Sequence, residues 1–156
     1  MRRWAVAALL LVVGCSAPEM ACPAIGSVSG ISVTVLAPYA AHVDGVRLTV
    51  CWSGQCQQHG VELAPGSDTI DQGCSGPDPD DTCSATAVPN GTKVGFAEIA
   101  KLPVGPVTVA ATLTVDGRRV PVAKVTRTAE PTYPAGPDCG PGGNQLRIEI
   151  DRTGIR

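Results

Sequence analysis

The seven cysteines are the residues of this sequence with the widest range of possible chemistry. A thiol can be a nucleophile, a metal ligand, half of a disulfide or a lipid attachment point. Cys15 stands apart from the other six. It ends the run Val12-Val13-Gly14-Cys15, which follows two arginines and an apolar stretch over residues 4–13. The other six cysteines lie further along the chain. We therefore expect Cys15 to have a role of its own.

The beginning of the chain has the pattern of a cleaved export signal. Its apolar stretch is about ten residues long, half the ~20 that a transmembrane helix needs, and it follows basic residues. Val12, Val13 and Gly14 match an aliphatic, a β-branched and a small residue before Cys15, and the segment resembles the lipobox of bacterial lipoproteins. This resemblance implies cleavage before Cys15, lipidation of its thiol with membrane lipid as partner, and an envelope location facing outside the cytoplasm. The alternative is a plain secreted protein.

Length and charge favour one small domain. We expect a signal peptide over 1–14, a lipidated tether over 15–29 and a single domain over 30–156. From Cys15 onward the chain has 10 basic and 14 acidic residues. This negative net charge argues against nucleic acid as a partner. Aromatic residues make up only 3% of the chain, so the core must be aliphatic and thin, and covalent staples would help it.

The domain is predicted to be all-β. Apolar and polar residues alternate over 31–35, 46–52, 107–115 and 146–150, which is typical of strands with one buried face. Proline and glycine recur about every ten residues and leave no room for a long helix. The pattern predicts a disulfide-stabilised, immunoglobulin-like β-sandwich of about seven strands.

The piece Leu102-Pro103-x-Gly105, between Phe96 and an alternating strand, supports the same architecture. It resembles a turn that recurs in immunoglobulin-like and prealbumin-like sandwiches. The resemblance implies that this piece turns the chain from one strand into the next, and it says nothing about a ligand.

Two hairpins can be placed from their turns. Asp116-Gly117 is a strong two-residue turn signal, and pairing outward from it sets Leu113 opposite Val120 on one face. Pro121 then falls within the second strand, which should be an edge strand or bulged there. A second hairpin turns at Ser53-Gly54.

Three disulfides are favoured over a metal site, because the six later cysteines are even in number and lie in a chain expected to be exported. The Ser53-Gly54 turn places Cys51 opposite Cys56 at a non-hydrogen-bonded position, where side chains approach closely. The expected pairs are Cys51–Cys56, Cys74–Cys83 and Cys22–Cys139. An exchange of partners among Cys22, Cys74, Cys83 and Cys139 stays open.

Catalytic residues are hard to find. His42 and His59 are the only histidines, each expected to be a solvated surface residue, and no Gly-x-Ser-x-Gly elbow occurs. We therefore expect no enzyme and no cofactor. The alternative is an exported hydrolase or metal-dependent enzyme with an unfamiliar site. Such an enzyme should bring a histidine and an acidic residue together in a concave pocket.

Residues 64–92 are predicted to be the longest irregular stretch and so the best candidate contact surface. Within it Asp78, Asp80 and Asp81 form an acidic loop, a weak candidate for Ca²⁺ whose simpler interpretation is a solvated loop. Asn90-Gly91-Thr92 is expected to be a tight turn.

A mild basic stripe near the expected edge strand comprises Arg118, Arg119 and Arg127. It could contact anionic lipid or a partner, but such charges more often protect an exposed edge from strand pairing. Taken together, the sequence predicts a monomeric, membrane-anchored, non-enzymatic binding or structural module. Its partner would be an envelope protein or glycan.

Overall fold

A computed structural model describes residues 21–156, so Cys15 and the signal segment lie outside the described residues. The chain is all-β, as predicted, with nine strands rather than about seven and two short 3-10 helices. The elements are β1 (Gly30–Val35), η1 (Tyr39–His42), β2 (Val43–Trp52), β3 (Gln55–Val61), β4 (Ala64–Cys74), β5 (Cys83–Glu98), β6 (Gly105–Val115), β7 (Arg118–Pro131), η2 (Pro137–Cys139), β8 (Asn144–Asp151) and β9 (Gly154–Ile155).

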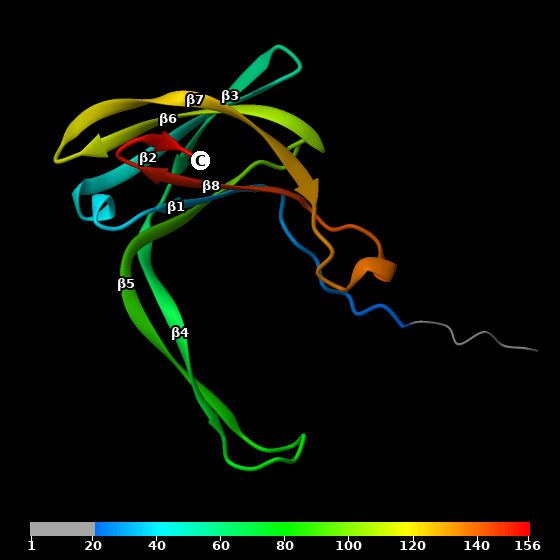
Figure 1. Cartoon of the computed structure of the whole chain (residues 1–156). Coiled ribbons are helices and arrows are strands. Elements are labelled where there is room, and N and C mark those ends of the chain that lie inside the picture. The colour runs from blue at the N-terminus through cyan, green and yellow to red at the C-terminus, as the bar shows by residue number, and fades with distance from the viewer. Residues whose placement is uncertain (1–20) are drawn as a thin grey trace, which may run out of the picture.

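The strands form the two layers of an open sandwich (Figure 1). Layer one has the order β3-β2-β6-β7, and layer two has the order β4-β5-β1-β8 with β9 beside β8. The end of β7 pairs with the start of β8, which joins the layers along one edge. β1 runs parallel to β8 and antiparallel to β5, so it lies in the middle of layer two.

The core between the layers is aliphatic. Leu48, Val50 and Val109 of layer one are fully buried, as are Ile31 and Ile148 of layer two. Burying each such side chain stabilises the fold by about 1.5–3 kcal/mol. The side chains of Trp52 and Tyr39 are only partly buried and pack against the outside of this core. The scarcity of rings noted in the sequence therefore gives a core of Val, Leu and Ile, as expected.

Both hairpins that the turns predict are present in the expected register. Leu113 lies opposite Val120, and Cys51 lies opposite Cys56. Asp116 has a φ of 47°, a left-handed conformation that the type I′ turn requires. The stretch of β7 around Pro121 pairs only with β6, so it is an edge there, as the proline predicts. The Leu102-Pro103 piece connects β5 to β6, and Leu102 is buried.

The segment 21–29, predicted to be part of a tether, is irregular but fastened to the domain. Cys22 is bonded to Cys139, and the Gly143 amide donates to the Ser27 side chain. The Asn144 amide donates to the Ser29 hydroxyl at 3.0 Å. These bonds hold the segment against the loop that follows β7, because backbone amides of Gly143 and Asn144 donate to serine hydroxyls of the segment. Residues 21–29, the part of the predicted tether that the structure describes, are therefore fastened to the domain, as the predicted Cys22–Cys139 bond requires.

Candidate functional site

The main departure from the sequence prediction is a long β-hairpin where an irregular stretch was expected. Residues 64–92 form β4 and most of β5, and beyond residue 66 the two strands leave the sandwich as a two-stranded arm (Figure 1). We call residues 67–89 the ribbon. Its strands pair from Ser67↔Pro89 to Cys74↔Cys83, about 25 Å at the usual rise of a strand. Neither face is covered by the sandwich, and every ribbon strand residue is exposed.

The ribbon is held together by its own contacts. A two-stranded hairpin alone is marginal in water, and the Cys74–Cys83 disulfide staples this one at its tip. The tip loop is closed by a bond from the Ser75 amide to the Thr82 carbonyl at 3.0 Å. The Asp71 carboxylate accepts from the Gly73 amide at 2.7 Å, where the strand bulges. These contacts keep the arm extended without support from the core.

At its base the ribbon is anchored by a bulge rather than by the predicted tight turn. Asn90-Gly91-Thr92 lies within β5, and Gly91 has a φ of 76°. The Asn90 side-chain amide donates to Asp68 at 2.8 Å, and its carbonyl oxygen accepts from the Thr92 hydroxyl at 2.8 Å. The left-handed residue that such a turn uses is present at Gly91, but the predicted chain reversal is not. The extra residues are instead accommodated in a continuing strand.

The two faces of the ribbon differ. Ile70 lies opposite Thr86 and Asp68 opposite Val88, so these four side chains share one face. Ile70 and Val88 are 48% and 44% exposed, so this face presents two large aliphatic side chains to solvent. We call this the Ile70 face. The opposite face carries small residues, Ala85 and Ala87 among them.

The ribbon also differs from the rest of the domain in its net charge. It contains five aspartates and no lysine or arginine, whereas the rest of 21–156 has ten basic and eight acidic residues. The aspartates are Asp68, Asp71, Asp78, Asp80 and Asp81. No ion pair among the described residues involves any of them. The arm is thus a strongly negative projection on a slightly positive body, and it attracts cationic surfaces.

The acidic tip does not gather into a metal site. Asp81 accepts a hydrogen bond from the Asp78 amide at 2.7 Å, so its carboxylate closes the turn. Across residues 21–156 no group of three His, Cys, Asp or Glu side chains is placed to hold a metal ion. The weak Ca²⁺ candidate Asp78, Asp80 and Asp81 gains no support from this geometry.

The disulfides are Cys22–Cys139, Cys51–Cys56 and Cys74–Cys83, the three pairs that the sequence favoured. The first bond joins the segment 21–29 to the loop after β7. The second joins β2 to β3, and the third joins β4 to β5 at the tip of the ribbon. With all six thiols paired, none of them is a nucleophile or a metal ligand.

The two histidines occupy different settings. The His42 ring nitrogen, at the end of η1, lies 3.6 Å from an oxygen of Asp116 in the β6–β7 turn, and the two side chains are 51% and 74% exposed. His59 was expected to be solvated and is instead partly buried. It lies opposite the core residue Leu48, and its Nε2 has no hydrogen-bond partner among the described residues. Among the described residues, His42 has an acidic neighbour and His59 has none within ion-pair distance.

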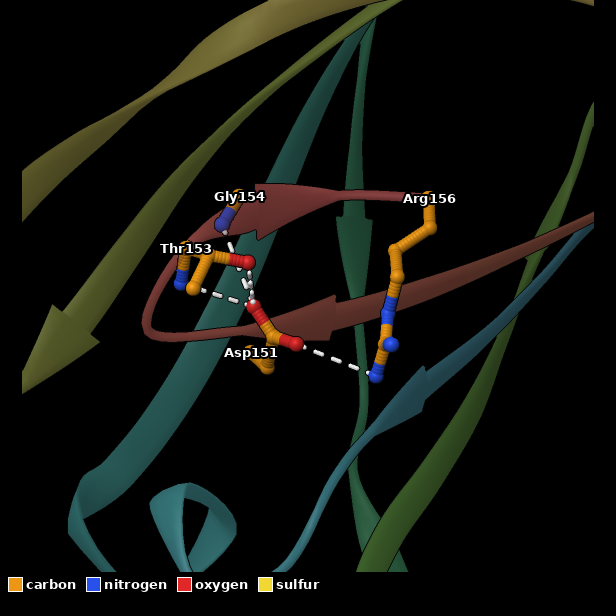
Figure 2. Close-up of polar contacts among 4 residues, drawn as sticks. All are labelled: Asp151, Thr153, Gly154 and Arg156. Atoms are coloured by element: carbon orange, nitrogen blue, oxygen red, sulfur yellow. Dashed lines mark hydrogen bonds and ion pairs between the residues drawn. The ribbon is translucent and has the colours of Figure 1, made fainter.

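The described carboxylate with a clearly shifted pKa, Asp151, is structural. Figure 2 shows it accepting bonds from the Thr153 hydroxyl and amide and from the Gly154 amide, with the Arg156 guanidinium 3.0 Å away. The Thr153 hydroxyl and then its amide hold the pKa of Asp151 below its ordinary 3.8, against the smaller effect of desolvation. This cluster fastens the β8–β9 turn at the end of the chain.

The basic stripe lies on β7. Arg118, Arg119 and Arg127 are all exposed, and the Arg127 guanidinium donates to the Thr126 carbonyl. Because β7 has a free edge around Pro121, the stripe accords with protection of that edge against strand addition. Within 21–156 no helix is long and apolar enough to cross a membrane.

Comparisons of the chain with protein-family models, curated proteins and solved structures find no match.

Proposed function

We propose that this protein is a membrane-anchored extracytoplasmic lipoprotein that acts as a non-enzymatic binding module, with the ribbon as its contact element. The anchor rests on the lipobox-like run that ends at Cys15. The binding role rests on one observation above the others: a stapled ribbon extends about 25 Å from the sandwich with both faces exposed. A projection of this kind contributes little to the core, since its side chains bury almost nothing.

The Ile70 face is the expected contact surface. It combines two exposed aliphatic side chains with Asp68, while Asp71 lies on the opposite face and the remaining aspartates lie in the tip loop. Its partner is a protein surface with an apolar patch bordered by lysine or arginine. Charge complementarity steers the encounter, and the apolar pair supplies burial once the two surfaces meet.

The ribbon has two free edges, one on β4 and one on β5, because β5 pairs with β1 only from Lys93 onward. The β4 edge carries a bulge after Asp71 and two aspartates, which discourage strand addition. A partner that adds a strand to β4 is therefore disfavoured, and we expect the partner to contact the side chains of the exposed faces.

Site-specific photo-crosslinking in the native envelope tests this proposal. The full chain would carry p-benzoylphenylalanine at position 86, on the Ile70 face, or at position 87, its neighbour on the opposite face. We expect a strong crosslinked product from position 86 and a weak one from 87, with the yield falling in 1 M salt, where screening shortens to ~3 Å. Position 108, on the outer face of layer one, serves as a control. Equal yields from all three positions would refute the proposal.

A further inference from the structure

A second surface lies on the outer face of layer two, away from the core. Two open clefts there have volumes of about 440 and 490 Å³ and share Ser32 and Arg147. One continues over β5 to Phe96, and the other continues to Thr128 and Thr132 where β7 leaves β8. The two clefts adjoin at these two residues, and we call the pair of clefts the trough.

The floor of the trough is built from two rows of side chains across β5, β1 and β8. One row is Phe96, Ser32 and Arg147. The next is Val94, Thr34 and Glu149. At ~4.8 Å between strands, the trough spans about 15 Å from β5 to β7. It therefore offers a ring and an aliphatic side chain at one end, hydroxyls in the middle, and charged hydrogen-bonding groups at the other.

Phe96 holds a fixed place in this floor. It is the only phenylalanine of the chain, and it lies on the outer face, partly exposed, rather than in the aliphatic core. A Cβ on Gly30 would lie 2.6 and 2.7 Å from two ring atoms, so the ring packs directly over the glycine. The absence of a side chain at residue 30 is what leaves room for the ring at the edge of the trough.

The shape and chemistry of the trough exclude several ligand classes. It is too open to enclose a small molecule, which usually buries most of its surface. Strand addition by a peptide at β1 or β8 is disfavoured, because β1 has paired neighbours on both sides and β8 is flanked by β7 at one end and β9 at the other. A single cation, Arg147, lines it, which is too little positive charge for a nucleic acid. An extended, largely uncharged polymer rich in hydroxyl groups remains.

We propose that the trough binds an extended glycan chain, with the Phe96 ring against the apolar face of one sugar. Arg147 donates hydrogen bonds to sugar oxygens, and Glu149 accepts them from sugar hydroxyls. Ser32 and Thr34 do both, since a hydroxyl donates and accepts. In Figure 1 the ribbon and the loop after β7 project to the same side of layer two and flank its outer face. The glycan site is separate from the Ile70 face, so the module would hold a wall polymer and a protein partner at once.

Affinity electrophoresis tests this site with the full chain, solubilised in detergent, run through gels that contain arabinogalactan, mannan or dextran. We expect at least one of these polysaccharides to retard the protein in a concentration-dependent way. Phe96→Ala and Arg147→Gln should each weaken the retardation about three- to tenfold. Thr112→Ala, on the outer face of layer one, should migrate like the parent protein.

Two further variants separate the explanations. Phe96→Leu keeps an apolar side chain over Gly30 but removes the ring, so it should stay folded and lose retardation like Phe96→Ala. A chain whose ribbon is replaced by a short Asn-Gly turn should still be retarded, so failure of the ribbon proposal would leave this one standing. Absence of retardation by all three polysaccharides, or parental retardation of Phe96→Leu, would overturn the glycan site.

Discussion

Removing the disulfide at the tip should loosen the ribbon and leave the sandwich folded. Cys74 and Cys83 are separated by 9 in sequence, so their bond closes a loop of about ten residues. The chain-entropy estimate for such a loop is about 2.7 kcal/mol. Because the ribbon packs on nothing but itself, this free energy stabilises the ribbon locally. It corresponds to roughly a hundredfold change in how often ribbon amides open.

Hydrogen exchange of the full chain measures this directly. In the double variant Cys74→Ser, Cys83→Ser, amides of Ile70 and Thr86 should exchange about a hundredfold faster, while the amide of Ile148 in the core keeps its parental rate. The matched control removes Cys51–Cys56, whose sequence separation of 5 gives about 2.2 kcal/mol. That bond lies in a hairpin of the sandwich, so its loss should accelerate layer-one amides.

Two results would refute this reasoning. If core amides accelerate in step with ribbon amides, the ribbon is energetically part of the sandwich, and its projection is not independent. If ribbon amides keep their parental rate, the backbone pairing alone holds the arm, and the tip disulfide is not its staple.

Three further predictions concern the fold and the anchor. Asp151→Asn should lower the melting temperature at pH 6. The difference should shrink as pH falls below about 3.8, because the depressed pKa of Asp151 means that its stabilisation is present above that value and lost as the carboxylate is protonated; a difference that grows in acid would contradict this. Gly95→Ala should cost about 1–3 kcal/mol in chemical denaturation, because a Cβ would collide with the Glu62 carbonyl and the Val61 side chain, whereas Gly45→Ala has room and serves as control. Cys15→Ser should release the protein from the membrane fraction on immunoblots, and unchanged membrane association would contradict the lipid anchor.

The parts of the fold that sequence reasoning predicted are those with one buried face. Ile148 and its neighbours in β8 alternate with polar residues because one side packs on the core. Short turns such as Asp116-Gly117 then fix the register, and register alone brought Cys51 opposite Cys56. Local chemistry and burial point to the same structure there, so the prediction was secure.

The ribbon could not be predicted by the same means. Its strands bury neither face, so no alternation of apolar and polar residues marks them, and Ile70 and Val88 are too few to form a pattern. Glycine, proline and aspartate, which usually indicate loops, here occupy bulges and a tip closed by a disulfide. The outward position of Phe96 on β5 was not predicted either, and the inner positions beside it are the small residues Gly95 and Ala97.

The most direct test of a binding module that acts through its ribbon is partner recovery from the native envelope. The lipidated chain and a variant with residues 67–89 replaced by a short Asn-Gly turn would be purified side by side after mild crosslinking. The variant keeps β1, β8 and the paired end of β5, so it should stay folded and membrane-bound. We expect the parental chain to recover a partner protein that the variant loses. Equal recovery by both chains would contradict the account.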